Sequence, residues 1–344
     1  MDATLVVLVV IAGLAYAWMN GMHDAANAVA TSLSTGALTA RTALPMSAVL
    51  NVVGALLGLH VAELFGLGLT VVPVRDPGPG LILLALLCAF AWNVLTWWFG
   101  VPTSSSHALI GALAGAGFAA GTAVDWHLLA LWLAVPLVVS PLLGFLGAWL
   151  FMALLLRLFR DAAHERAIRG FRMMQSLTAA TMSVGHGLQD GQKTMGVITL
   201  ALGAGVGADA VGWVSAPGAS PRDVVPGWVQ LLVALALGLG TLAGGWRIIR
   251  TLSRRIVRMT PATGFAAESV ASAVLYTSAG LVGVPVSSTH TVTASIMGAG
   301  ATGGLRAIRW GTVRRIIGAW LLTPAVTFGV AAGVVWLAEA IRTR

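Results

Sequence analysis

Apolar residues occur along the chain in blocks of about twenty or more positions, without the alternation of apolar and polar residues typical of a transmembrane β-barrel. A helix rises about 1.5 Å per residue, so a block of this length can cross the hydrocarbon core of a bilayer. The pattern therefore predicts an all-α integral membrane protein. The blocks cover residues 4–20, 43–66, 80–120, 127–156, 175–205, 227–246, 262–304 and 314–338.

Two of these blocks, 80–120 and 262–304, contain a Gly-Val-Pro sequence followed by short hydroxyl side chains. Proline disfavours helical geometry at the residue before it, and Ser and Thr are preferred helix N-caps. We therefore expect each block to contain a break, with a second helix that starts at about Ser105 or Ser288.

Composition agrees with a membrane protein, because 58% of the residues are hydrophobic, 9% are charged and the mean hydropathy is +0.89. The formal net charge is +8. The arginines lie beside apolar blocks and are not interleaved with aromatic residues, so we expect anionic membrane lipid, and not nucleic acid, as their partner. The single cysteine, Cys88, excludes a disulfide framework within the chain.

Arginine is concentrated in three segments, 157–172, 247–258 and 306–315. The positive-inside rule places all three in the cytoplasm. Block 80–120 then begins and ends outside, block 262–304 begins and ends inside, and the other six blocks cross the membrane. Both termini are expected outside the cytoplasm of a multi-pass plasma-membrane protein.

The two halves of the chain share sequence. GVPTSSSHALIGALAGAG at 100–117 matches GVPVSSTHTVTASIMGAG at 283–300 in nine of eighteen positions, and GMHDAANAVA at 21–30 weakly matches GLQDGQKTMG at 187–196. Inverted repeats with segments interrupted by Gly and Pro are typical of secondary transporters with a binding site near the midplane. We predict about six full spans and two broken-helix re-entrant hairpins. The expected division is a first inverted repeat at 1–156, a basic amphipathic linker at 157–174 and a second repeat at 175–344.

The residues near these motifs favour an anion site. A helix that starts inside the membrane directs free N–H groups and a partial positive charge at an oxyanion. Asp24, Asp190 and Glu268 are acidic residues next to these motifs, and ionisable groups at that depth are functional candidates. Lys193, the only lysine, lies three positions after Asp190, where it can neutralise the carboxylate or contact the anion.

The motifs HDAANAVATSLSTGALT, GHGLQDGQKTMGVITLAL and ESVASAVLYTSAGLVGVPVSSTHTVTASIMGAG resemble those of the inorganic phosphate transporter (PiT) family, of the bacterial low-affinity phosphate permease type. The resemblance implies cation-coupled import of phosphate, two hairpins that meet at the substrate, and a homodimer. We expect alternating access around a site built from the two repeats, and whether the substrate is phosphate or a metal–phosphate complex stays open. No cofactor is expected apart from a co-transported proton or sodium ion. The candidate substrate-binding residues are Asp24, Asn27, Ser104, Ser105, Ser106, Asp190, Lys193, Ser287, Ser288 and Thr289.

The candidate cation-coupling residues are His23, Asp24, Gln189, Asp190 and Glu268, with His107 and His290 as candidate proton-relay residues and Asp24 and Asp190 as candidate sodium ligands. Compared with the family pattern, the chain has His23 and Gln189 where asparagine is usual, and Asn51 where a glutamate matching Glu268 is expected. These departures favour coupling to protons.

Two other functions remain open from the sequence. A sulfate permease would share the architecture, although sulfate has no proton to donate to the motif aspartates. An intramembrane serine hydrolase would need one activated serine, and a duplicated set of Ser and His residues is not explained by catalysis.

Overall fold

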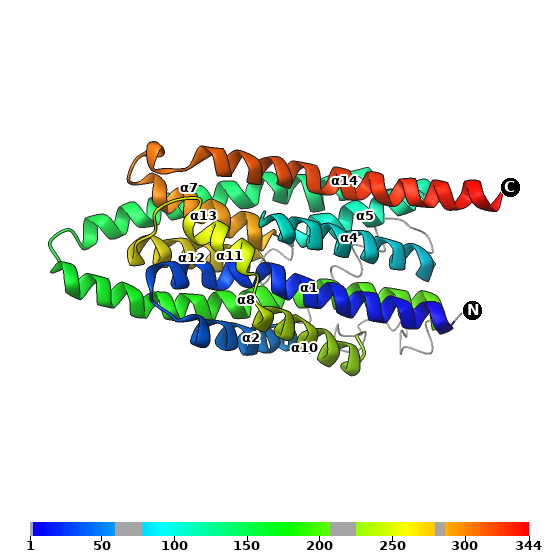
Figure 1. Ribbon diagram of the computed structural model, residues 1–344, viewed down its shortest axis with the longest axis horizontal. Helices are drawn as coiled ribbons and strands as arrows, with labels where there is room; N and C mark the ends of the chain where they lie inside the picture. The colour runs from blue at the N-terminus through cyan, green and yellow to red at the C-terminus, as the bar shows by residue number, and fades with distance from the viewer. Residues whose placement is uncertain (1–2, 59–77, 207–224, 279–285, 344) are drawn as a thin grey trace.

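The computed structural model describes residues 3–58, 78–206, 225–278 and 286–343, and it contains no strand within these ranges. The expectation of an all-α protein is confirmed. The helices form one elongated bundle (Figure 1). In chain order they are α1 (Ala3–Thr35), α2 (Ala40–Leu57), α4 (Pro79–Phe99), α5 (Ser105–Ala119), α6 (Trp126–Leu129), the π-helix η1 (Ala130–Ala134), α7 (Val135–Leu158), α8 (His164–Val206), α10 (Gly227–Ala243), α11 (Trp246–Arg254), α12 (Pro261–Thr277), α13 (Ser288–Ala301), the 3-10 helix η4 (Leu305–Ala307) and α14 (Trp310–Arg342).

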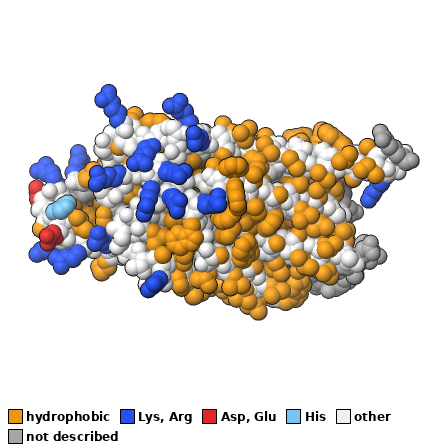
Figure 2. Space-filling view, viewed as in Figure 1, with side chains coloured by type: hydrophobic (Ala, Val, Ile, Leu, Met, Phe, Trp, Pro, Cys, Tyr) orange, Lys and Arg blue, Asp and Glu red, His pale blue; other side chains and the backbone are white. Residues whose placement is uncertain are grey.

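The bundle has two chemically different ends. The described ends of the chain lie together at one of them, which we term the terminal end (Figure 1). Arginine side chains gather toward the opposite, arginine-rich end, and a broad hydrophobic surface lies between the two (Figure 2). This is the distribution of charge expected for a multi-pass membrane protein.

Five helices are long and apolar enough to cross a membrane, and the pair α10 and α11, bent by 62°, would be a sixth span. The long helix α8 also runs between the two ends of the bundle, although its polar residues lower its hydropathy (Figure 1). One of the five, α4, belongs to a hairpin. By length and composition, the candidate full crossings are α1, α2, α7, α14 and the bent pair α10 and α11. The apolar blocks also predict a crossing at 175–205, which lies within α8.

The first hairpin consists of α4 and α5 and opens toward the terminal end (Figure 1). Its first helix ends at Phe99 and is capped by Gly100, whose φ of 65° is rarely adopted by amino acids other than glycine. The second helix begins at Ser105, and the Ser104 side chain caps it by accepting a hydrogen bond from the His107 N–H. The predicted break and helix start are confirmed.

The second hairpin consists of α12 and α13 and opens toward the arginine-rich end (Figure 1). Its second helix begins at Ser288, and the Ser287 side chain accepts a hydrogen bond from the His290 N–H. The cap is therefore the same in both hairpins. The predicted break at Pro285 lies outside the described residues. The two hairpins enter from opposite ends, and their inner helices start near the middle of the bundle.

The two halves of the chain interleave through close contacts at glycines. Gly21 of α1 lies against the backbone carbonyl of Leu237 in α10, and Gly187 of α8 lies against that of Asn51 in α2. Neither site has room for a Cβ atom. Gly21 and Gly187 occupy matched positions in the two acidic motifs, so each half makes the same contact with a helix of the other half. Small residues permit this close packing of membrane helices.

The hairpins repeat this arrangement. Gly115 of α5 lies against the carbonyl of Phe328 in α14, and Gly298 of α13 lies against that of Phe145 in α7, again without space for a Cβ atom. Gly115 and Gly298 are matched positions of the serine-rich motifs. The inner helix of each hairpin is therefore held by the last spanning helix of the other half.

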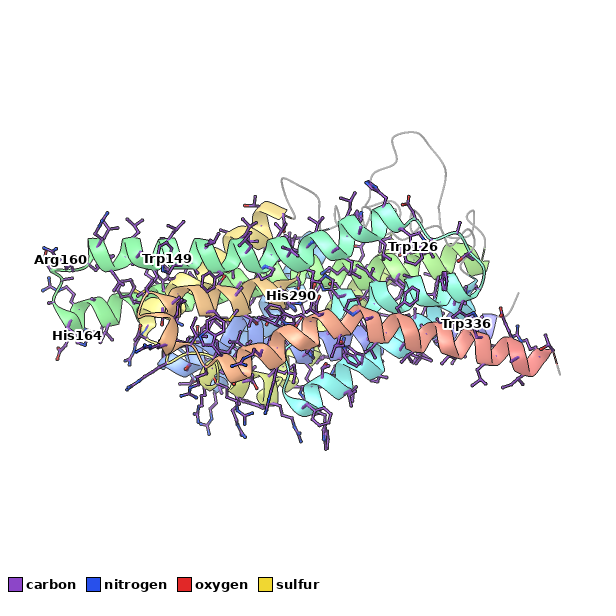
Figure 3. All side chains as sticks on the ribbon, turned by 90° about the horizontal axis from the view of Figure 1, so that it is seen from above. Trp126, Trp149, Arg160, His164, His290 and Trp336 are labelled. Carbon is purple, nitrogen blue, oxygen red and sulfur yellow. The ribbon has the colours of Figure 1, made fainter. Side chains whose placement is uncertain are left out.

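Residues 164–174 of the expected amphipathic linker form the first turns of α8, which with α7 extends past the other helices beside Arg160 and His164 (Figure 3). One detail differs from the sequence expectations. Asn51 lies on α2 and Glu268 on α12. In the order of the two halves, α2 corresponds to α10 and α12 to α4, so Asn51 does not occupy the position matching Glu268.

Candidate functional site

A buried polar cluster lies at the centre of the bundle, where α1 and α8 meet the inner helices of the hairpins. It contains Asp24 of α1 and Asp190 of α8, and the His186 ring bridges them. His186 Nε2 lies 2.8 Å from Asp190 Oδ2 and 3.4 Å from Asp24 Oδ2, while its Nδ1 lies 2.9 Å from Asn51 Oδ1. The two motif aspartates therefore form one site, as the repeat predicts.

Lys193 binds Asp190 and the first hairpin together. Its Nζ lies 2.6 Å from Asp190 Oδ1 and donates a hydrogen bond of 2.6 Å to Ser106 Oγ. All three side chains are buried. The predicted pairing of the lone lysine with Asp190 is present in the structure, and the ammonium also lies at the start of α5.

The second hairpin makes a corresponding contact with α1. Thr289 Oγ1 donates to Asp24 Oδ1 at 3.0 Å, and Asn27 Nδ2 donates to Thr289 Oγ1 at 3.1 Å. Ser106 and Thr289 are matched residues of the two hairpins, and each contacts the residue three positions after a motif aspartate. The start of α5 therefore contacts the residues around Asp190, and the start of α13 contacts those around Asp24 in a related arrangement.

The remaining serines of the hairpins have mainly backbone roles in this state. The hydroxyls of Ser104 and Ser287 cap their helices. The carbonyl of Ser105 accepts a hydrogen bond of 2.9 Å from the Tyr16 hydroxyl, which fixes the start of α5 against α1. Ser105 and Ser288 are the first residues of α5 and α13, where backbone N–H groups have no acceptor within the helix.

The residues preceding the two aspartates lie differently. His23 Nδ1 is 3.1 Å from Asp24 Oδ1, and its Nε2 is 3.3 Å from Thr96 Oγ1 of α4. Gln189 Nε2 instead donates to the carbonyl of Leu275 at 2.8 Å and to Ser278 Oγ at 2.9 Å, at the end of α12. His23 thus belongs to the carboxylate cluster, whereas Gln189 connects α8 to the second hairpin.

Glu268 forms a separate polar cluster and contacts neither motif aspartate. Its Oε1 accepts hydrogen bonds from the hydroxyls of Thr31 and Ser32, and its Oε2 accepts one of 2.6 Å from Thr178. The carboxyl is fully buried, and no cationic side chain lies within ion-pair distance of it among the described residues. The three predicted carboxylates therefore occupy two sites.

The two motif histidines contact each other, with their ring planes tilted by 59°, where the inner helices of the hairpins approach each other. The ring centroids of His107 and His290 are 4.9 Å apart, and the centroid of the His290 ring lies 4.2 Å from that of Trp320. In the described part of the chain, neither ring nitrogen of His290 has a hydrogen-bond partner. A relay through this pair therefore remains a prediction.

Sequence reasoning missed His186 and the hydroxyl partners of Glu268. His186 precedes Asp190 by four residues, so helical spacing places both on one face of α8. Thr31 and Ser32 lie within the motif HDAANAVATSLSTGALT at 23–39. Their contact with Glu268 joins residues more than two hundred positions apart, which no local pattern predicts.

The cluster offers cationic and hydrogen-bonding groups without an evident catalytic pair. Beside the carboxylates of Asp24 and Asp190, it holds one ammonium, the His186 imidazole, hydroxyls from both hairpins and two helix starts that favour negative charge. Among the described residues, no serine hydroxyl is hydrogen-bonded to a histidine ring. This arrangement suits an anion held between opposing hairpins.

Comparison with known proteins agrees with this geometry. The model of the phosphate transporter family matches residues 20–171 and 159–331. A probable low-affinity inorganic phosphate transporter of Bacillus subtilis is 38% identical over 320 residues, covering 93% of this chain and 92% of that protein. One of Rhizobium meliloti is 40% identical over 333 residues, covering 94% of each.

A solved structure described as the sodium-dependent phosphate transporter has the same fold, with a TM-score of 0.80 and coverage of 98% of this chain and 100% of that one, at 22% identity. The relatives are named as transporters and not as enzymes, which removes the hydrolase hypothesis. The resemblance noted in the sequence is confirmed, and the chain belongs to the phosphate transporter family.

Proposed function

We propose that the protein imports inorganic phosphate across the plasma membrane by alternating access, driven by a proton gradient. The names of its relatives support phosphate as the substrate. The paired contacts of Ser106 with Lys193 and of Thr289 with Asp24 carry the proposal, because they bring two opposed helix starts to one charged cluster.

Phosphate would bind between the hairpin starts. Lys193, Ser106, Thr289 and Asn27 would donate hydrogen bonds to its oxygens, together with the free N–H groups of α5 and α13. A protonated phosphate oxygen would in turn donate to Asp24 or Asp190. Sulfate has no such proton, so it would leave a buried carboxylate without a hydrogen-bond donor.

The composition of the cluster favours protons as the coupling ion. Lys193 already places an ammonium 2.6 Å from Asp190, where sodium would be repelled by it. His186, within 3.4 Å of both carboxylates, and His23, beside Asp24, are groups that exchange protons. The protein with the similar fold is described as sodium-dependent, so sodium is the alternative that the experiment must distinguish.

Access from both sides would follow from the opposed hairpins. Each hairpin opens to a different end of the bundle, so a small movement of either one would expose the cluster to that end (Figure 1). Gln189 and Glu268 would couple the second hairpin to α8 and α1, because their hydrogen bonds join these elements. Assembly as a homodimer, metal–phosphate complexes as cargo and a cytoplasmic arginine-rich end belong to the same proposal.

Uptake of radiolabelled phosphate into proteoliposomes tests the proposal, with an imposed proton or sodium gradient and with sulfate as competitor. We expect uptake driven by the proton gradient, resistant to sulfate and lost in Asp190→Asn. Asp161→Asn is the matched control, because Asp161 is 91% exposed and lies outside the cluster. Uptake driven only by a sodium gradient would refute proton coupling. If added sulfate abolishes phosphate uptake, the assignment of phosphate as the specific substrate would be refuted.

A further inference from the structure

The short helix α11 bears an unusual concentration of positive charge. It follows Gly244, whose φ of 73° ends α10, and the two helices are bent by 62°. Ile248, Ile249 and Leu252 are buried in the hydrophobic core. The opposite face carries Arg247, Arg250 and Arg254, which recur at helical spacing, with Arg255 following directly.

Two adjoining pockets lie on this face. One, of about 400 Å³, is lined by Arg247, Arg250 and Arg255 together with Trp98, Phe99, Gly100, Trp246 and Thr251. The other, of about 320 Å³, is lined by Arg250 and Arg254 with Leu33, Ser34, Trp246, Ile249 and Ser253. Arg250 and Trp246 border both. No acidic side chain lines either pocket.

The arginines of the pockets are not neutralised by the protein. None of the four forms an ion pair within the described residues. Arg247 is held in place by a hydrogen bond of 2.6 Å from its guanidinium to the Trp98 carbonyl, and it stacks 4.2 Å above the Trp98 ring. The site is therefore built, because one guanidinium is fixed while its neighbours remain available to an anion.

The surroundings indicate a lipid as the source of that anion. Trp98, Phe99 and Trp246 on the rim are 57%, 68% and 48% exposed, and arginine side chains lie at the border between the hydrophobic band and the arginine-rich end (Figure 2). Tryptophan and arginine at such a border are typical of the headgroup region of a bilayer. Basic pockets between helices at this depth bind phosphate-bearing headgroups.

We propose that the two pockets on α11, joined at Arg250, bind the headgroup of an anionic phospholipid. This site lies apart from the central carboxylate cluster and does not depend on the transported substrate. It touches the first hairpin directly, because Thr251 Oγ1 donates a hydrogen bond of 2.7 Å to the carbonyl of Gly100. A bound lipid would therefore hold α11 against the hairpin break.

Native mass spectrometry of the purified full-length protein tests the site, by titration with dioleoyl phosphatidylglycerol and, separately, with dioleoyl phosphatidylcholine. Wild type should bind the anionic lipid in preference to the zwitterionic one. Arg250→Gln/Arg254→Gln should weaken the tightest phosphatidylglycerol binding at least about tenfold, because each basic residue near a membrane surface adds about a factor of five. Arg314→Gln/Arg315→Gln removes the same charge from exposed positions of α14 and should leave it unchanged.

Three outcomes would overturn the proposal. An equal loss of phosphatidylglycerol affinity in the two double variants would show a general charge effect. Displacement of the lipid by millimolar inorganic phosphate would show that the pockets bind free phosphate. Unchanged binding in Arg250→Gln/Arg254→Gln would exclude the pockets. If that variant does not fold, Arg250→Gln alone replaces it, with Arg314→Gln as its control. None of these results depends on whether the protein transports phosphate.

Discussion

Removing the ammonium of Lys193 tests the charge balance at the centre of the bundle. Its Nζ lies 2.6 Å from Asp190 Oδ1 and 2.6 Å from Ser106 Oγ, and all three side chains are buried. Lys193→Met keeps an unbranched side chain and leaves Asp190 with His186 as its remaining basic partner. Loss of one partner from a buried ion pair costs about 3–5 kcal/mol. Because His186 remains, we expect the lower end, about 3 kcal/mol.

Equilibrium unfolding in mixed detergent micelles measures this free energy for the wild type and three variants. Asp190→Asn/Lys193→Met removes both charges and should recover most of the stability lost in Lys193→Met. Arg314→Met, which removes an exposed positive charge from α14, should change the free energy of unfolding by less than about 0.5 kcal/mol. The reasoning fails if the double variant is as unstable as Lys193→Met, or if Lys193→Met is as stable as Arg314→Met.

Three further predictions concern packing, coupling and topology. Gly187→Val should prevent folding, measured as loss of monodisperse protein after extraction, because a Cβ there meets the Asn51 carbonyl, whereas Gly318→Val, with open space at its Cβ, should fold normally. Glu268→Gln should lower gradient-driven uptake more than about tenfold and leave equilibrium phosphate binding within about twofold, because Glu268 lies outside the central cluster; a parallel loss of binding would contradict this. In a Cys88→Ser background, cysteine at position 166 should react with an impermeant thiol reagent only from the cytoplasmic side, and cysteine at position 343 only from the outside. The reverse labelling pattern would show that the arginine-rich end lies outside the cell.

The repeat made much of the fold predictable from the sequence. Gly-Val-Pro followed by hydroxyl residues gave both helix starts correctly, because proline and N-cap preferences act over a few residues. Placing the three arginine-rich segments on the same side of the membrane required block 80–120 to begin and end outside and block 262–304 to begin and end inside. The opposite directions of the two hairpins were predicted in this way. The pairing of Asp190 with Lys193 was also local, since the two residues are three positions apart on one helix.

The parts that were missed depend on contacts between distant segments. The correspondence of Asn51 with Glu268 was wrong because α2 follows the first acidic motif directly, whereas Glu268 lies in a hairpin helix. His186 became a candidate only when α1 brought Asp24 within 3.4 Å of its ring. Such long-range contacts arise from the interleaving of the two halves through glycines, which sequence periodicity does not specify.

The two halves share one scaffold but differ in charge, and under the proposed function this difference would give them different roles. Matching Asp24 with Asp190 also matches Asn20 with His186, His23 with Gln189 and Asn27 with Lys193.

Asp190 therefore has an ammonium, from Lys193, and an imidazole, from His186, both supplied by the second half. Asp24 contacts the His23 ring and the Thr289 hydroxyl, and it shares the His186 ring with Asp190. An anion between the hairpins would be drawn toward Ser106 and Lys193, where positive charge is fixed. Under the proposed function, proton exchange would then fall to Asp24, whose basic neighbours are the imidazoles of His23 and His186. Under the same proposal, symmetry of the backbone would permit access from both sides, and asymmetry of these side chains would separate substrate binding from coupling.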